Sequence, residues 1–501
     1  MIIKVENGVP RHPLWRMAEP VSLEIEKGEQ IAVVGDNAAG KSRLVEILTG
    51  HYPLLSGGEI HYDFSPAASP LVCDNLKYIS FRDSYGEQDG AYYYQQRWNL
   101  HDIPDDMPTV GEWLNSELED TRFKSFPAVF HLEELSSKHI ISLSSGELRK
   151  LQIAKALATN PRVLILDNPF IGLDAQTRSD FRALLETLTS EADLQVILVL
   201  SKCDDIPDFI THVFPIESLR VLPKTTLAEY RRKHAARPLP KLGEETREWI
   251  GGLPARDLSA SGFYPAEGGE ILRFRNVSIR YGSRTILQPL NWSVREGERW
   301  ALSGPNGSGK STLLSLVCAD NPQAYACDIE LFGHRRGTGE SIWQIKKHIG
   351  YVSPEMHRAY LKDIPAIDVV ASGLSDSVGL YVRPRPEQKQ ACLDWMRVFG
   401  IEPVADRSFL QLSSGEQRLC LLARAFVKDP ELLILDEPLH GLDDRNRELV
   451  RQIIVQFCLR PHKTLVMVTH YEEELPSCIT HRLYLTSSTS SAKRGRSQPP
   501  L

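Results

Sequence analysis

Short apolar runs alternate along the chain with longer segments in which apolar residues recur every three or four positions. Runs such as "QIAVVG" at 30–35, "RVLILD" at 162–167 and "VILVL" at 196–200 are continuously apolar, as is typical of strands buried on both faces of a sheet. Segments such as "SRLVEILTG" at 42–50 have helical spacing instead. This alternation predicts an α/β fold, in which a mostly parallel sheet has helices on both sides.

The chain repeats itself at a constant spacing. "GDNAAGKS" at 35–42 returns as "GPNGSGKS" at 304–311, and "LSSGE" at 143–147 returns at 412–416, so that each motif lies 269 residues after its counterpart. A duplication of this kind predicts two similar domains in tandem. We predict four segments: a first domain at 1–217, a linker at 218–269, a second domain at 270–486 and a disordered tail at 487–501.

The linker and the tail differ in composition from the repeats. The linker is rich in Pro, Gly and charged residues, and Pro238, Pro240 and Pro254 argue against one continuous helix. We expect a helix or two within it. The tail is rich in Ser and carries a few basic residues, which favours disorder over a nucleic-acid-binding arm.

The bulk composition restricts function only weakly. A length of 501 residues favours two to four domains, and a net charge of -7 gives no global reason to bind nucleic acid or an anionic membrane. The eight cysteines form no CxxC pair and no zinc-binding pattern. The start has no secretory signal, and no apolar run approaches the roughly 20 residues of a membrane helix. We therefore expect a cytoplasmic protein, which could act at the inner face of a membrane only through separate permease subunits.

Both GxxxxGKS stretches follow an apolar strand and precede a helical pattern. Small residues there let backbone N–H groups surround phosphate oxygens, and the helix N-terminus adds positive potential. Lys41 and Lys310 are expected to reach the β- and γ-phosphates of ATP, while Ser42 and Ser311 hold Mg²⁺. The predicted ATP-binding residues are Gly35, Asp36, Asn37, Gly40, Lys41 and Ser42 in the first copy and Gly304, Pro305, Asn306, Gly307, Ser308, Gly309, Lys310, Ser311 and Thr312 in the second.

Each copy also has an apolar strand that ends in an aspartate, Asp167 or Asp436. Such a residue places a carboxylate beside the magnesium ion in phosphoryl-transfer sites. The copies differ at the following residue. Glu437 can orient or deprotonate an attacking water, whereas Asn168 cannot take a proton. We therefore predict that Glu437 and Lys310 are catalytic and that the first copy is degenerate.

These motifs resemble the ATP-binding cassette (ABC) ATPases, in which "LSSGE" lies some 20 residues before the aspartate strand and "GLD" a few residues after it. The resemblance covers both copies and implies two P-loop NTPase domains, each with a helical subdomain. It also implies that the two cassettes of a single, monomeric chain pair head to tail as a pseudo-dimer, so that each ATP lies between one phosphate loop and the opposite signature. The signature residues are Ser144, Ser145 and Gly146 in the first copy and Ser413, Ser414 and Gly415 in the second.

The same resemblance implies two further roles in the second copy. His470 matches the family's switch histidine, which contacts the γ-phosphate, and Tyr281 matches the aromatic residue that stacks on adenine. At the constant spacing, Ser201 replaces the switch histidine in the first copy. A weak alignment places His12 opposite Tyr281, with Trp15 as an alternative stacking residue.

Two unlike composite sites follow from this comparison. The second phosphate loop belongs to a site with every catalytic group, whereas the site of the first loop has Asn168 and Ser201 in their place. Our hypothesis is that the first site binds ATP as a long-lived clamp and the second hydrolyses it. The alternative is decay of a redundant site, against which the retention of Lys41, Ser42 and Asp167 argues.

A further resemblance concerns the segment at 320–357, "DNPQAYACDIELFGHRRGTGESIWQIKKHIGYVSPEMH". It is similar to the group of tandem cassette proteins called ModF or photorepair proteins, and this similarity implies a link to molybdate transport. One departure matters. Transport cassettes usually carry Gln after the "IGYV" strand, where Pro354 stands here and Phe81 in the first copy. This departure argues against direct coupling to a transporter unless Glu355 substitutes.

Three classes of function remain open. The chain is an ATPase subunit that energises an importer, a soluble ATP-driven switch that acts on the ribosome or DNA, or a regulator that only binds nucleotide. The translation-factor branch of the family has a longer basic helical linker and two complete sites, so it is disfavoured. A binding-only role would leave Glu437 and His470 idle. We expect a Mg²⁺-dependent ATPase that converts ATP and water to ADP and phosphate.

Overall fold

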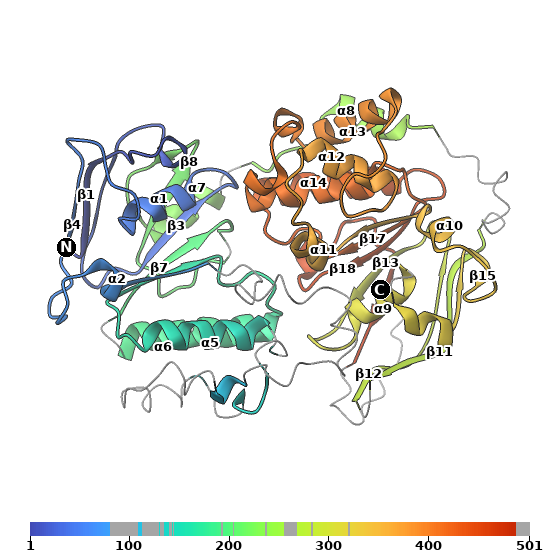
Figure 1. Cartoon of the computed structure of the whole chain (residues 1–501), viewed down its shortest axis with the longest axis horizontal. Coiled ribbons are helices and arrows are strands. Elements are labelled where there is room, and N and C mark those ends of the chain that lie inside the picture. Colours follow the sequence, from blue (N-terminus) through green and yellow to red (C-terminus); the bar gives the residue numbers. More distant parts are fainter. Residues whose placement is uncertain are drawn as a thin grey trace.

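The computed structural model describes residues 1–80, 109–112, 130, 135–139, 143, 145–191, 194–203, 205–235, 238–254, 268–281, 284–318 and 321–486. The expectations for Phe81, Ser144 and the tail at 487–501 fall outside these residues. Figure 1 shows the two halves of the chain side by side, the first in blue to green and the second in yellow to red.

The first half contains a mostly parallel sheet and a smaller antiparallel one. The larger sheet has the order β10-β8-β3-β7-β6-β5, with β9 paired to β8, and the smaller has the order β2-β1-β4. The strands are β1 Ile3–Gly8, β2 Val21–Ile25, β3 Ile31–Gly35, β4 Glu59–Tyr62, β5 Leu76–Ser80, β6 Val163–Asp167, β7 Gln195–Leu200, β8 His212–Glu217, β9 Arg220–Val221 and β10 Thr225–Thr226. The helices are η1 Pro13–Trp15, α1 Lys41–Leu48, α2 Val72–Asn75, α5 Ser145–Leu157, α6 Ala175–Glu191 and α7 Leu227–Ala235.

The second half repeats this plan with a parallel sheet of order β16-β17-β18-β13-β19 and an antiparallel sheet of order β12-β11-β14-β15. The strands are β11 Glu270–Tyr281, β12 Arg284–Arg295, β13 Arg299–Ser303, β14 Asp328–Leu331, β15 His334–Arg335, β16 Ile349–Val352, β17 Leu432–Asp436, β18 Thr464–Val468 and β19 His481–Tyr484. The helices are α9 Lys310–Val317, η7 Pro322–Ala326, α10 Ile342–Lys346, α11 Pro354–Ala359, α12 Ala366–Ala371, η8 Ser372–Leu374, α13 Pro386–Val398, η9 Glu402–Val404, η10 Phe409–Gln411, α14 Ser414–Phe426, α15 Asp444–Cys458 and η11 Glu472–Glu474.

The two parallel sheets have the same strand order. In the first half β5, β6, β7, β3 and β8 are neighbours in that sequence, and β16, β17, β18, β13 and β19 are neighbours in the second. The aspartate-ended strands β6 and β17 keep the 269-residue spacing at both ends. Their apolar side chains are fully buried, as expected for strands covered on both faces. The predicted α/β fold with two tandem domains is confirmed.

A helical subdomain covers one side of the second half. Helices α12, α13 and α14 pack together, and α14 also contacts β16. Their core is aromatic: the ring of Phe426 lies 5.1 Å from that of Trp395 and 4.9 Å from that of Phe457. In Figure 1 these helices form the upper layer of the second half, above its parallel strands. Much of the corresponding stretch of the first half lies outside the described residues.

The segment predicted as a linker is divided between the two halves. Strands β9 and β10 pair with β8, and α7 packs against both β8 and β10, so the sheet of the first half continues beyond residue 217. A second helix, α8, spans Glu244–Gly251 and packs on α15 of the second half. The expected helices are therefore present, one attached to each half.

Specific contacts fix α8 on the second half. Ile250 is fully buried, and the ring of Trp249 meets that of Trp395 edge to face at 5.2 Å. Just before the helix, the side chain of Gln452 accepts a hydrogen bond from the Leu242 backbone and donates one to a neighbouring carbonyl oxygen. Among the described residues, no helix combines the length and the apolar character needed to cross a bilayer.

Candidate functional site

The second phosphate loop connects β13 to α9. Gly309 precedes the helix with φ +90°, a conformation that favours glycine. A Cβ atom on Gly304 would meet the Leu485 carbonyl oxygen at 2.5 Å, so the loop requires glycine there too. The Lys310 Nζ atom donates to the carbonyl oxygens of Gly304 and Pro305 at 2.7 and 2.9 Å. Burial lowers the pKa of Lys310, while the carboxylates of Glu437 and Asp436 oppose this shift.

One polar atom in this loop is poised for a ligand. The hydroxyl oxygen of Ser308 is buried and has no hydrogen-bond partner among the described residues. A buried hydroxyl without a partner is costly, so it is expected to find one when the loop is filled. With the Lys310 ammonium and the N-terminus of α9, it provides donors and positive charge. These groups fit phosphate oxygens.

The first phosphate loop has the same construction. Lys41 Nζ donates to the carbonyl oxygens of Gly35 and Asp36 at 2.7 and 2.8 Å, and burial lowers its pKa to about 8. Gly40 precedes α1 with φ +112°. Where the second loop has glycine at a positive φ, the first has Ala38 at φ +60°. That conformation costs a non-glycine residue roughly 1–2 kcal/mol.

Oxygen donors gather at the end of β17. The Ser311 hydroxyl donates to Asp436 Oδ2 at 3.4 Å. Burial raises the pKa of Asp436 to about 8, and the negative charges of Glu437 and Glu355 add to the effect. A buried group of carboxylates beside a hydroxyl is a donor set that suits Mg²⁺, whose charge would relieve the repulsion. Glu355 therefore lies close enough to Asp436 for its charge to act there, whereas the sequence left open whether Glu355 substitutes for the usual Gln.

Two histidines hold the carboxylate of Glu437. His470 Nε2 lies 2.9 Å from Glu437 Oε1, and His440 Nδ1 lies 3.2 Å from Oε2. Burial opposes ionisation of Glu437, but the hydrogen bonds from both rings hold its pKa well below the ordinary range. His470 was predicted to contact the γ-phosphate, and that contact stays a prediction. His440 was missed, although it stands three residues after Glu437 in the same turn and could have been noticed there.

Asn168 occupies the equivalent backbone position in the first half. Its φ is +52° and that of Glu437 is +49°, and each N–H donates to the adjacent parallel strand, at Val199 or Val468. Asn tolerates this left-handed conformation better than most residues do. Its side-chain amide donates to Asp167 Oδ1 at 2.7 Å. The backbone at the two positions is therefore preserved, while the carboxylate of Glu437 is replaced by an amide in Asn168.

The first phosphate loop contacts the second half directly. The Asn37 backbone N–H donates to Asp443 Oδ2 at 2.8 Å, and its side chain donates to the Gly441 carbonyl oxygen at 3.0 Å. A Cβ atom on Gly415 would overlap the Asn37 amide, so glycine allows this approach. Beside it, Ser413 caps α14 through a capping box with Glu416. The first loop and the second signature thus lie together.

On the other side of the interface, the first half's "GLD" turn lies near enough to the second phosphate loop for its charge to act there. The charge of Asp174 acts on Lys310 and opposes the fall in its pKa. Gly146, in the first turn of α5, lies against Thr177 of α6. Ser144 is outside the described residues, and for Ser145 the backbone alone is described. The predicted set for the second composite site is therefore brought together only in part.

The structure describes the expected adenine-stacking residues only in part. Tyr281 is the last residue of β11, and its side chain lies outside the description. The rings of His12 and Trp15 both lie beside that of Tyr52. The ring centroid of His12 is 5.4 Å from that of Tyr52, and the centroid of Trp15 is 5.6 Å from it. Ser201, at the position of the switch histidine, borders the same cavity between the halves as His470. Stacking on adenine stays a prediction in both halves.

A cationic cluster joins the halves beside the switch histidine. The ring of Tyr471 has the guanidinium of Arg178 at 3.9 Å and the ammonium of Lys202 at 4.2 Å, both from the first half. Burial raises the pKa of Tyr471 and lowers that of Lys202 to about 8. Glu474 pairs with Lys202 and with Arg447. The residue after His470 is thus held by the opposite half.

Duplicated phosphate loops, aspartate-ended strands and contacts between the halves define a tandem P-loop NTPase. The family model described as ABC transporter matches residues 18–171 and 287–440. The chain belongs to this family, and its two ABC domains bind ATP and make it an ATPase.

Similar proteins share the tandem arrangement. The chain is 38% identical over 468 residues to the ABC transporter ATP-binding protein ModF of Escherichia coli, covering 92% of each. It is 29% identical over 485 residues to the uncharacterized ABC transporter ATP-binding protein C323.04 of Schizosaccharomyces pombe, covering 95% of each. Among solved structures, the archaeal ribosome recycling factor aABCE1 in complex with the stalk protein aP1 is similar in fold, with a TM-score of 0.54 and 19% identity, covering 95% of this chain and 87% of that one.

The Tyr471 cluster yields a prediction about the contact between the halves. Tyr471→Leu removes the cation–π contacts of Arg178, Lys202 and Arg447, of which the first two cross between the halves and together contribute about 1–2 kcal/mol at partly buried sites. We expect backbone amide exchange near Cys203, whose N–H donates to Asp444 across the interface, to accelerate by about 5- to 30-fold. Tyr471→Phe keeps the ring and is the matched control. Equal exchange rates in the two variants would show that the ring does not hold the interface.

Proposed function

We propose that the second composite site hydrolyses ATP and that the first holds ATP without turning it over. The observation that carries this proposal is the contrast at one backbone position. Glu437 is an ionised carboxylate held by two imidazoles, whereas Asn168 is an amide tied to its neighbouring aspartate. A positioned acid or base typically contributes 10² to 10⁴ in rate, and the first site has none at this position.

At the second site the chemistry follows from the groups around β17. Glu437 orients the attacking water and accepts its proton, while Lys310 and the N-terminus of α9 stabilise charge on the phosphates. Ser311 and Asp436 would hold Mg²⁺, which supplies further charge to the phosphate oxygens. His470, 2.9 Å from Glu437, is placed to contact both the carboxylate and the γ-phosphate.

At the first site the binding groups remain. Lys41 is held against its loop as Lys310 is, Asp167 ends β6, and Asn37 already contacts the second half. These contacts support a nucleotide clamp between the halves. Decay of a redundant site would not explain why the loop, the charge and the contact across the interface are all retained.

Two measurements test this assignment: the steady-state rate of ATP hydrolysis, and the amount of nucleotide that stays bound after desalting. Glu437→Gln should lower turnover by about 10² to 10⁴ while leaving nucleotide binding intact. Asn168→Glu should stay close to wild type, because Ser201 still lacks an imidazole.

Lys41→Ala should release the retained nucleotide and slow turnover, whereas decay of the first site predicts no effect. Normal turnover by Glu437→Gln would contradict the proposal.

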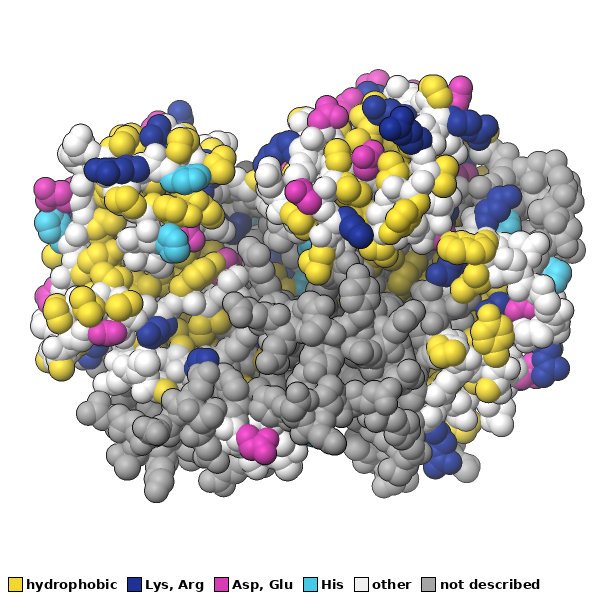
Figure 2. All heavy atoms as spheres, viewed as in Figure 1, with side chains coloured by type: hydrophobic (Ala, Val, Ile, Leu, Met, Phe, Trp, Pro, Cys, Tyr) yellow, Lys and Arg dark blue, Asp and Glu magenta, His cyan; other side chains and the backbone are white. Residues whose placement is uncertain are grey.

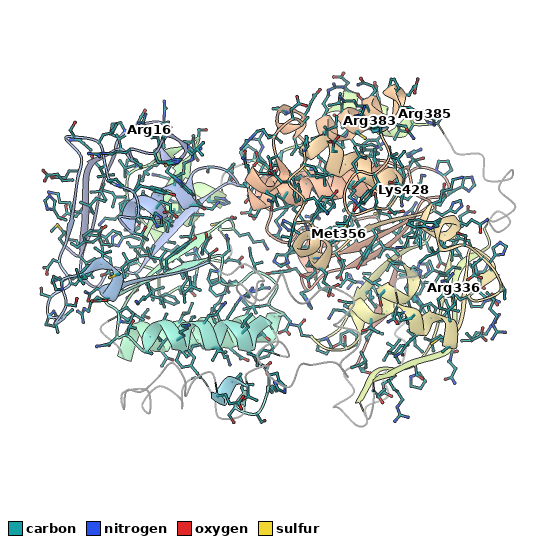
Figure 3. All side chains as sticks on the ribbon, viewed as in Figure 1. Arg16, Arg336, Met356, Arg383, Arg385 and Lys428 are labelled. Carbon is teal, nitrogen blue, oxygen red and sulfur yellow. The ribbon has the colours of Figure 1, made fainter. Side chains whose placement is uncertain are left out.

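The target of the cycle is the second part of the proposal. The name of the 38% identical relative, an ABC transporter ATP-binding protein, supports a transport role, with separate membrane subunits and a location at the inner membrane face. An exposed apolar and basic segment in the helical subdomain supports a protein partner. Tyr381 and Val382 are 75% and 68% exposed, and they adjoin Arg383 and Arg385 at the upper edge of the molecule (Figure 3). Figure 2 shows apolar and basic side chains side by side over this region.

A different observation favours the alternative, an ATP-driven switch that acts on a soluble macromolecule such as the ribosome or DNA. Where transport cassettes have Gln after the strand, Pro354 begins α11 and Ser353 caps it. Met356 of this helix lies beneath α14 (Figure 3), 3.3 Å from an Arg424 nitrogen. A proline in the first turn offers no side-chain amide to relay the state of the γ-phosphate.

The two targets differ in where the ATP-bound protein is found. Glu437→Gln with ATP should accumulate the closed form, which is the form expected to hold the target. If the cycle drives a transporter, this variant should copurify with integral membrane subunits after detergent extraction, and wild type with ADP should not. Cosedimentation with ribosomes or retention on DNA, without membrane subunits, would favour the soluble switch instead.

A further inference from the structure

We infer that His440 positions the hydrolytic carboxylate only when the two halves are in contact, so that closure of the interface is transmitted to Glu437 through this ring. The inference rests on the proposed hydrolytic role of Glu437. It assigns His440 a positioning role in the reaction, and it makes Gly172 of the first half part of the second half's catalytic arrangement.

The ring of His440 connects the two halves. On one side its Nδ1 atom lies 3.2 Å from Glu437 Oε2. On the other side it lies against Gly172 of the first half, where a Cβ atom would come within 3.0 Å of the ring carbon Cε1. The ring is mostly buried, with 14% of the side chain exposed. The same side chain therefore contacts the catalytic carboxylate and the opposite half.

Local structure fixes the start of this connection. The His440 backbone N–H donates to the Glu437 carbonyl oxygen at 3.1 Å, which closes a turn directly after the carboxylate. Glu437 accepts from His470 at one carboxylate oxygen and from His440 at the other. With both oxygens engaged, the carboxylate plane is fixed, whereas the bond from His470 alone leaves it free to rotate about χ3. Of the two rings, that of His440 is the one shown to lie against Gly172 of the first half.

The two halves differ at this point. At the constant spacing, Ile171 stands in the first half where His440 stands in the second, and it offers no donor. Both residues border a cavity of about 30 Å³ between the halves, which Asn168, Glu437 and His470 also line. That volume holds about one water molecule. The connection from interface to carboxylate thus exists only on the side of the hydrolytic site.

Gly172 and Gly441 are equivalent positions that allow a matched test. Both have a positive φ, +69° and +76°, so alanine strains the backbone equally at either one. A Cβ atom on Gly172 meets the His440 ring, whereas one on Gly441 has nothing within 4 Å. The difference between Gly172→Ala and Gly441→Ala therefore isolates the contact with His440 from the backbone strain.

The experiment measures kcat and KM for ATP hydrolysis by the full chain. A hydrogen bond to a charged group is lost in His440→Ala, so kcat should fall about 10- to 100-fold with KM within about twofold of wild type. His440→Asn, whose amide can donate from nearly the same place as Nδ1, should recover much of the loss. Gly172→Ala should lower kcat more than Gly441→Ala does.

Two controls separate the possible failures. In the His440→Ala background, Gly172→Ala should add no more than Gly441→Ala does, because the ring that it disturbs is gone. If Glu437→Gln keeps its activity, the proposed hydrolytic role fails as well. If Glu437→Gln is inactive while His440→Ala keeps the wild-type kcat, only the inference about His440 is overturned. It is also overturned if Gly172→Ala and Gly441→Ala have equal kcat values. Bound nucleotide and thermal unfolding, measured for each variant, verify that the protein is folded.

Discussion

The contact between the first phosphate loop and the second half is the constraint on which the rest of the structure depends. Asn37 donates to both Asp443 and Gly441, and its amide fits only because Gly415 has no side chain. Backbone groups make much of this contact, so it requires a particular relative placement of the halves. This placement brings the first loop against the second signature, and contacts such as the Tyr471 cluster also join the halves.

The same backbone carries unlike side chains in the two halves. The left-handed residue after each aspartate strand, and its hydrogen bond to the next strand, are preserved in Asn168 and Glu437. The side chain of Asn168 carries no charge and is one methylene shorter than that of Glu437. In this chain two ABC domains, matched at residues 18–171 and 287–440, lie in a single polypeptide.

Much of this organisation could be predicted from the sequence. The apolar run that ends in Asp436, the glycine loops and the constant spacing are local patterns, and they correctly predicted the strands, the fold and the ATPase family. Contacts between distant residues were not predictable in this way. The approach of His440 to both Glu437 and Gly172 depends on how the halves dock, and proline positions gave no sign that α7 and α8 belong to different halves.

The most direct test of the central claim is the identity of the nucleotide in each half after turnover. The purified protein would be incubated with Mg²⁺ and a photoreactive ATP carrying its label on the γ-phosphate, crosslinked during steady-state hydrolysis and cleaved in the stretch between the halves at 238–243. Two unlike sites predict that the γ-label remains on the fragment that carries the first phosphate loop and is lost from the other. Equal loss of the label from both fragments would contradict the account.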